Sequence, residues 1–136
     1  EIVGAPWLAA TEAVRMLNGL GLGGVTFEAE AFTPEQKPYQ GSPPELAGEL
    51  LQGVRLRVTD RDAFEPYKAG VAMLWAVYRL HPDRLVWNDV VLDRLVATPR
   101  LEQMLVAGKE PAEIFASWQD EVEAFKARSA PYRLYE

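Results

Sequence analysis

Apolar and polar side chains alternate in two short stretches of this chain, and each alternation predicts a half-buried β-strand. In the stretch GVTFEAEAF, one face is apolar and the other carries Glu28 and Glu30. In the stretch VRLRVT, the face opposite the apolar one carries Arg55 and Arg57. We expect the second strand to lie near the first, in a small mixed or antiparallel sheet.

Helical spacing of apolar residues predicts two helices in the first two thirds of the chain. The first is expected to have Pro6 in its opening turn and to end at Asn18 and Gly19. The second is expected to begin with a capping box formed by Asp62 and Glu65. The inward-facing positions are Trp7, Ala10, Val14 and Leu17 in the first helix and Phe64, Tyr67, Val71, Leu74, Trp75 and Tyr78 in the second.

The last third of the chain predicts a short helix followed by a longer final one. The short helix is expected to close at Gly108, and the final helix to begin at Pro111. Residues 85–98 fit either a strand or a helix, and residues 131–136 are expected to form an edge strand or an extended closing segment. The inward-facing positions are Leu101, Met104 and Leu105, and then Ile114, Phe115, Trp118, Val122 and Phe125.

The order of these elements favours an α+β fold. Helices outnumber strands and do not alternate with them in a regular βαβ pattern. Residues 33–48 contain four prolines and two glycines, which predicts a long irregular loop. We therefore expect residues 1–136 to form a single compact α+β domain, with a small sheet packed by about four helices.

Composition narrows the class of protein. With 136 residues, 49% of them hydrophobic and 25% charged, the chain has the composition of an ordinary globular domain. A net charge of −6 argues against a nucleic-acid partner. The apolar stretch 69–78 falls short of the ~20 residues that cross a bilayer, so no transmembrane segment is expected. The chain starts at Glu1 rather than Met, and we expect the gene product to extend upstream.

Two carboxylates offer one candidate for acid–base chemistry. Glu28 and Glu30 share a strand face, roughly 6 to 7 Å apart at ~3.3 Å per residue. That spacing is near the carboxyl separation of inverting glycosidases. Alternating acidic residues are also what a solvated strand face requires, and this is the simpler interpretation.

Other residue types give less support for catalysis. His81 is the one histidine, and a cation at the end of a helix is a simpler role for it than proton transfer. Without cysteine or a second histidine, the chain offers little for a metal site, and we predict no metal and no cofactor. The three serines, Ser42, Ser117 and Ser129, lack the context of a catalytic triad.

Two regions are candidates for ligand binding. Asp60 and Arg61 follow a predicted strand, where exposed side chains on a rigid scaffold are often functional. The alternative is that Asp62 caps the next helix and Arg61 pairs with a neighbouring carboxylate. The second region combines aromatic rings and a cation that suit sugar or peptide groups. Its members are Trp7, Phe32, Lys37 and Tyr39. For Trp7 and Phe32 the alternative is packing in the core.

Nine short motifs occur in order along the chain. They are GAPWL at 4–8, V-x-F at 25–27, FTP at 32–34, G-x-x-x-x-G-V at 48–54, VTDR at 58–61, F-x-P at 64–66, HPD at 81–83, DRL at 93–95 and Y-x-L-Y at 132–135. In this combination the chain resembles the C-terminal domain of the NamZ-type exo-β-N-acetylmuramidases. These are glycoside hydrolases that remove terminal N-acetylmuramic acid from peptidoglycan fragments.

The resemblance implies a division of labour with a second domain. In that family an N-terminal Rossmann-like domain comes first, the active site lies in the cleft between the domains, and the catalytic carboxylate is on the N-terminal side. The implied partners are that domain, absent from this chain, and a muropeptide or muramic acid glycoside. The resemblance also implies a secreted or periplasmic setting and an isolated chain without activity. The expected substrate-binding residues are Trp7, Phe32, Lys37, Tyr39, Asp60 and Arg61.

The chain departs from the family pattern at several places. It has GELLQG at 48–53 in place of a cysteine-containing turn, Arg57 in place of a frequent histidine, Leu92 in place of an aromatic residue, and Val96 with Ala97 in place of a glycine. The muramic acid lactyl group is anionic, so Lys37, Arg57 or Arg61 can pair with it. Two alternatives remain open. One is a non-catalytic module that binds glycan or muropeptide, and the other is a structural domain whose exposed apolar surface is covered by the rest of the protein.

Overall fold

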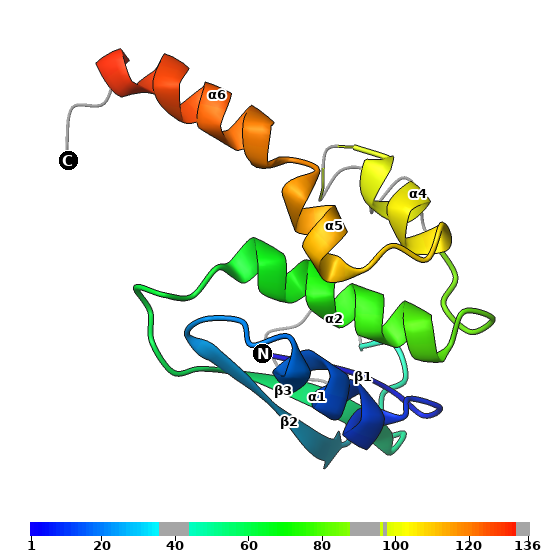
Figure 1. Cartoon of the computed structure of the whole chain (residues 1–136). Coiled ribbons are helices and arrows are strands. Elements are labelled where there is room, and N and C mark those ends of the chain that lie inside the picture. The colour runs from blue at the N-terminus through cyan, green and yellow to red at the C-terminus, as the bar shows by residue number, and fades with distance from the viewer. Residues whose placement is uncertain (36–43, 88–95, 97, 133–136) are drawn as a thin grey trace. The chain divides into compact units, whose positions relative to one another are not determined.

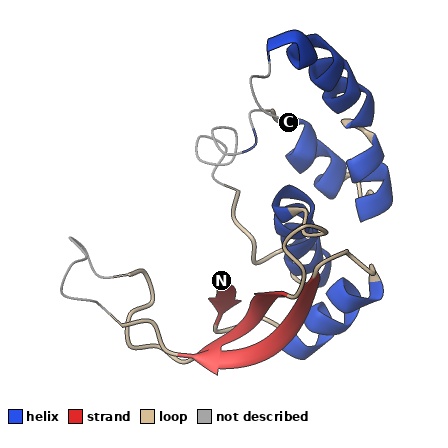
Figure 2. Cartoon of the chain, turned by 90° about the vertical axis from the view of Figure 1, so that its left-hand side faces the viewer, coloured by secondary structure: helices blue, strands red, loops and turns tan. Residues whose placement is uncertain are grey.

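The computed structural model describes residues 1–35, 44–87, 96 and 98–132. The chain divides into two compact units, Glu1–Leu85 and Val86–Glu136, and each is described by itself. The first unit holds the strands and two helices, and the second is helical (Figures 1 and 2). Within the described residues, none of the helices has the length and apolar character needed to cross a membrane.

The first unit is built on a three-stranded antiparallel sheet. Both predicted strands form and lie side by side, with Val25 opposite Val58 and Phe32 opposite Leu51. A third, shorter strand pairs with the other side of the central one, so the order is β1-β3-β2. The strands are β1 (Ile2–Ala5), β2 (Val25–Phe32) and β3 (Leu51–Val58). The predicted α+β fold with a small antiparallel sheet is confirmed.

Burial follows the predicted alternation over only part of the two long strands. Val25, Phe27 and Val54 are buried, as expected for one face of a half-buried sheet. Ala29 lies on the same face but is exposed. Helix α1 (Ala10–Gly19) packs on β2 and β3. At ~1.5 Å per residue it is about 15 Å long, shorter than an eight-residue strand, so it covers only part of that face.

Helix α2 (Pro66–Leu80) packs against α1. Ala69, Ala72 and Ala76 are buried at helical spacing, which lets two helix backbones approach closely. Of the predicted inward stripe, Val71 and Trp75 are buried. Its other members are half-buried or exposed, and Tyr67 is 45% exposed. The buried face of α2 is therefore rotated about the helix axis from the stripe of large residues that the sequence predicted.

The starts of both helices differ from the predicted ones. Pro6 lies in a turn, and α1 begins at Ala10. Asp62 does not cap α2, because Glu65 precedes the helix and its first residue is a proline, where a missing N–H costs little. Instead the Asp60 carboxylate Oδ1 accepts hydrogen bonds from the backbone N–H groups of Asp62, at 2.9 Å, and Ala63. Asp60 thus organises the turn between β3 and α2.

The second unit contains helices α4 (Arg100–Val106), α5 (Pro111–Ala116) and α6 (Gln119–Ser129), followed by a 3-10 turn at Ala130–Tyr132. Gly108 closes α4 as predicted, with a positive φ of 72° that suits glycine. Leu101, Leu105 and Ile114 are buried.

The predicted final helix is in fact two helices. It breaks between α5 and α6, where the Ser117 hydroxyl donates to the carbonyl O of Ile114 at 2.7 Å. Arg100 fixes this joint, since it donates to the Ser117 carbonyl and forms an ion pair with Glu121. The predicted inward positions in α6 are wrong, because Val122 is 37% exposed and Phe125 is 57% exposed.

Some predicted features lie outside the described residues. The loop predicted at 33–48 is described only at its two ends, where the N–H of Gly48 donates to the carbonyl of Pro34 at 3.0 Å. Most of the ambiguous stretch 85–98 also lies outside them, as do residues 133–136. The first residues of the expected closing strand, 131 and 132, belong to the 3-10 turn.

Asn18 joins the end of α1 to the edge of the sheet. Its side-chain Nδ2 donates to the carbonyl O of Phe27 at 2.9 Å, and its Oδ1 accepts from the N–H of Phe27 at 3.0 Å. Both backbone groups of Phe27 point away from β3, at the open edge of β2. One side chain therefore caps an edge strand and holds α1 on the sheet.

Gly24 locks the start of β2 to the turn that follows β3. Its φ is +69°, and its carbonyl O accepts from the N–H groups of Thr59, at 2.9 Å, and Asp60, at 3.3 Å. A Cβ at Gly24 would lie 2.2 Å from the carbonyl O of Asp60 and 2.7 Å from the N of Phe64. Only glycine satisfies both the backbone conformation and the space.

We expect Asn18→Ala to lower the free energy of unfolding by about 1–3 kcal/mol, because two backbone groups of Phe27 lose their partner. Arg15→Ala is the control on the same helix. Its ion pair with Glu12 is exposed and local, so its cost should be small. Urea unfolding of both variants measures the difference, and equal midpoints would contradict the role given to Asn18.

We expect Gly24→Ala to destabilise the fold by about 3 kcal/mol or more, since steric overlap adds to the left-handed backbone conformation. Gly21→Ala is a matched control, because Gly21 also has a positive φ, of 64°, but a Cβ there would meet nothing within 4 Å. It should cost about 1–2 kcal/mol, the conformational part alone. Thermal or urea unfolding that found equal losses would rule out the predicted overlap.

Candidate functional site

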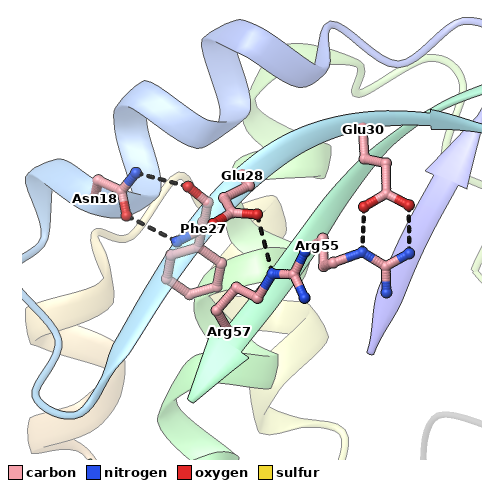
Figure 3. A network of polar contacts seen from close by, with 6 residues as sticks. All are labelled: Asn18, Phe27, Glu28, Glu30, Arg55 and Arg57. Atoms are coloured by element: carbon pink, nitrogen blue, oxygen red, sulfur yellow. Dashed lines mark hydrogen bonds and ion pairs between the residues drawn. The ribbon is translucent and has the colours of Figure 1, made fainter. Parts of the chain in front are cut away.

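The acidic side of β2 and the basic side of β3, both predicted from the sequence, lie on the same face of the sheet. Arg57 Nε donates to Glu28 Oε2 at 3.0 Å, and Arg55 makes two hydrogen bonds to the carboxylate of Glu30 (Figure 3). In the register Glu28 lies opposite Arg55, so both ion pairs run diagonally between β2 and β3. The two carboxylates are therefore neutralised by two arginines of the neighbouring strand.

The ion pairs decide what these carboxylates can do chemically. The Arg55 guanidinium lowers the pKa of Glu30 from its ordinary value, chiefly through its hydrogen bonds. In turn Glu30 raises the pKa of Arg55. A general acid of a glycosidase needs a raised carboxyl pKa, and Glu30 is shifted the other way. The arrangement supports the charged-face interpretation of Glu28 and Glu30 over the catalytic one.

Asp60 and Arg61 have different surroundings although they are neighbours. The Asp60 carboxylate is engaged by the turn that it organises, with Oδ1 accepting from the N–H of Asp62. Arg61 is exposed and forms no ion pair with any residue that the structure describes, so the predicted pairing with a neighbouring carboxylate is not found there. Arg61 is a cation held beside a rigid turn and accessible to an anionic ligand.

Phe32 lies on a pair of glycines. A Cβ at Gly4 would lie 2.6 Å from Phe32 Cε1, and one at Gly53 would lie 2.7 Å from the same atom. Gly4 of β1 is opposite Gly53 of β3. The ring therefore rests directly on the backbone of two strands and remains half-buried. Packing accounts for one side of this ring.

Trp7 lies next to the one histidine. The two ring centroids are 5.1 Å apart with an edge-on angle of 64°. His81 Nε2 accepts a hydrogen bond from the backbone N–H of Ala9 at 3.0 Å. His81 lies at the end of α2, as expected from the sequence, and its side chain joins this end to the residue before α1.

The four predicted binding residues that the structure describes do not lie together at one place. Asp60 and Arg61 follow Val58 at one end of the sheet, and Phe32 ends β2 at the other. The eight residues of β2 place these ends about 23 Å apart at ~3.3 Å per residue. Trp7 follows β1 and belongs to the Phe32 end, while Lys37 and Tyr39 lie outside the described residues. The two ends are separate candidate sites.

Sequence reasoning missed several residues that position these sites. Asn18, Gly24 and Gly53 hold the sheet and its turns, yet each reads as an ordinary helix end, loop or strand residue in the sequence. The Gly-Gly pair at 23 and 24 was a signal for a tight approach of two backbones. Among the described residues, no group of three or more His, Asp or Glu side chains is close enough to hold a metal ion.

Comparison with known proteins gives one consistent result. The family model for the C-terminal region of the exo-β-N-acetylmuramidase NamZ matches residues 1–135. The peptidoglycan β-N-acetylmuramidase NamZ of Bacillus subtilis (strain 168) is 32% identical over 136 residues, which are 99% of this chain and 31% of that protein. The chain therefore spans about a third of the length of this relative.

A solved structure shares the fold. It is a DUF1343 family protein from Bacteroides fragilis NCTC 9343, which superimposes with a TM-score of 0.61 at 24% sequence identity. The match covers 99% of this chain and 35% of that one. Since the family model covers nearly every residue, the resemblance seen in the nine motifs is confirmed, and this chain belongs to the family of NamZ C-terminal domains.

Proposed function

We propose that this chain is the C-terminal domain of a longer glycoside hydrolase that releases terminal N-acetylmuramic acid from peptidoglycan fragments. In this proposal it forms one wall of the substrate cleft beside a preceding catalytic domain. The observation that carries it is the family match over residues 1–135 in a chain that spans 31% of its muramidase relative. Because the substrate derives from the cell wall, we place the enzyme outside the cytoplasmic membrane.

The chemistry of the strand face supports a binding role rather than a catalytic one for this chain. Both candidate carboxylates, Glu28 and Glu30, are held in ion pairs with arginines of β3. A catalytic acid needs a proton to give, and a lowered pKa leaves Glu30 ionised near neutral pH. The acid and base of the proposed enzyme then come from the preceding domain.

Arg61 is the residue that we assign to the cleft. The carbonyl O of Glu1 accepts from the N–H of Leu56, so the chain enters this unit at the end of the sheet where Val58 leads into Arg61. A domain joined before Glu1 is attached at that end. The lactyl group of muramic acid is a carboxylate, which a guanidinium binds through two parallel hydrogen bonds.

A second candidate function is a module that binds glycan without cleaving it. It is favoured by the other end of the sheet, where Trp7 and Phe32 are two half-buried aromatic rings and the loop at 33–48 begins. Aromatic faces suit sugar rings, and this end lies about 23 Å from Arg61 by the length of β2. Affinity of the chain for muropeptides that is lost in Trp7→Ala and kept in Arg61→Ala would support this candidate.

The first test is hydrolysis of a chromogenic N-acetylmuramic acid glycoside by the full-length gene product and, in parallel, by this chain alone. We expect activity in the full-length protein alone, because the catalytic acid is assigned to the preceding domain. Activity in the isolated chain would overturn that assignment. Inactivity of both proteins, together with binding of muropeptides, would favour the non-catalytic module.

We expect Arg61→Ala in the full-length protein to raise KM for the muramic acid glycoside several-fold with a smaller change in kcat, since an anionic group of the substrate loses its partner. Arg15→Ala serves as the control because Arg15 is also an exposed arginine of this unit, on α1. The same glycoside without the lactyl carboxylate should not distinguish Arg61→Ala from the wild type. An unchanged KM would remove Arg61 from the cleft.

We expect Glu30→Gln to leave kcat within a few-fold of the wild-type value, because general acid catalysis contributes roughly 10²–10⁴-fold and Glu30 does not supply it. NMR titration of the Glu30 carboxyl should show a pKa below the ordinary value, and Arg55→Ala should raise it. A loss of kcat on the scale of an acid–base residue, without loss of folded protein, would return Glu30 to the list of catalytic candidates.

A further inference from the structure

The central strand is paired unequally on its two sides. β2 pairs with all eight residues of β3, whereas β1 pairs with only four, Gln52 to Arg55. One more hydrogen bond follows, from the N–H of Leu56 to the carbonyl O of Glu1 at 2.9 Å. Within the described part of the chain, no strand lies beside Arg57 and Val58 on the β1 side.

The backbone groups of Val58 point toward that uncovered side. In an antiparallel ladder, residues two apart direct their N–H and C=O groups to the same side of the strand. Leu56 directs its N–H toward β1. Phe27, which lies opposite Leu56, directs its own groups to Asn18 and away from β3, as this pattern requires. Val58, two residues beyond Leu56, therefore presents its N–H and C=O beside the end of β1.

We propose that the residues immediately before Glu1 in the full-length protein continue β1 along β3. The register is already fixed, because each step back along β1 is one step forward along β3 from the pair of Ile2 and Arg55. The first upstream residue then lies opposite Arg57, and the second forms a hydrogen-bonded pair with Val58. This inference depends on the proposed function only in that the chain is part of a longer protein.

The occupant of this edge is the upstream segment rather than another chain. An uncovered strand edge is a template for pairing, and Glu1 holds the upstream residues beside it covalently. The loop that must close is therefore as short as possible, and the entropy cost is small. Val58 is 44% exposed, so its side chain also has room for a neighbour on the next strand.

The pairing has a consequence for how the two domains are joined. A strand that is hydrogen-bonded to β3 as far as Val58 is a rigid connection and not a flexible linker. It leaves the sheet beside the turn that carries Asp60 and Arg61. The preceding domain would then be held at the end of the sheet to which the substrate contact is assigned.

Amide hydrogen exchange in the full-length protein tests this pairing. We expect the Val58 amide to be protected to within about tenfold of the Leu56 amide, which is hydrogen-bonded to Glu1. The amide of exposed Arg61 gives the rate of an accessible turn residue in the same molecule. If Val58 exchanged as fast as Arg61, the proposal would fail.

Proline substitutions test whether the second upstream residue is paired with Val58. Proline at the second position upstream of Glu1 removes the N–H that donates to the Val58 carbonyl and places its ring against β3. It should therefore separate the two strands at this pair and speed Val58 exchange by about tenfold or more. Proline at the first position upstream is the control, since the N–H there points away from β3 at the sheet edge. Protection that survives the second-position proline would mean that this residue is not paired with Val58 and would overturn the proposal. Exchange is measured without substrate, so neither result depends on whether the protein hydrolyses a muramic acid glycoside.

Discussion

The contact between Gly24 and the turn after β3 is the constraint on which the rest of the first unit depends. The carbonyl of Gly24 accepts hydrogen bonds from Thr59 and Asp60, so the start of β2 and the end of β3 are fixed against each other. That contact sets the register of the ladder, in which Val25 lies opposite Val58. The register in turn brings Arg55 and Arg57 within reach of Glu30 and Glu28. The same turn starts α2 and carries Arg61, so fold and candidate site share one backbone contact.

The periodic parts of this fold could be predicted from the sequence, and the junctions between them could not. Alternation identified β2 and β3, because a half-buried sheet needs it, and helical spacing identified α1. The capping box at Asp62 was wrong because an equally good acceptor, Asp60, lies two residues earlier and is placed by a contact with a distant loop. The break before α6 was missed because no proline or glycine marks it, and one of the contacts at the joint comes from Arg100, which lies 17 residues before Ser117.

The candidate site shows the same limit more sharply. The sequence correctly predicted an acidic strand face and a basic one, but it could not show that the two charges neutralise each other across a diagonal register. It also grouped Phe32 with Arg61, although β2 separates them by its full length. Residue types that suit a ligand are common on any surface. Only the sheet order shows which of them share an end of the molecule.

Strand order and direction also bear on how a two-domain glycosidase would use this chain. β1 is an edge strand that runs antiparallel to β3, so anything before Glu1 meets the sheet where β3 ends. A site at the Phe32 end would lie about 23 Å from that junction and would need a preceding domain that reaches along the whole sheet. A site at Arg61 needs no such reach, because the junction and the cation are at the same end. The topology is therefore consistent with the proposed assignment of Arg61 to the cleft, independently of the chemistry of the arginine.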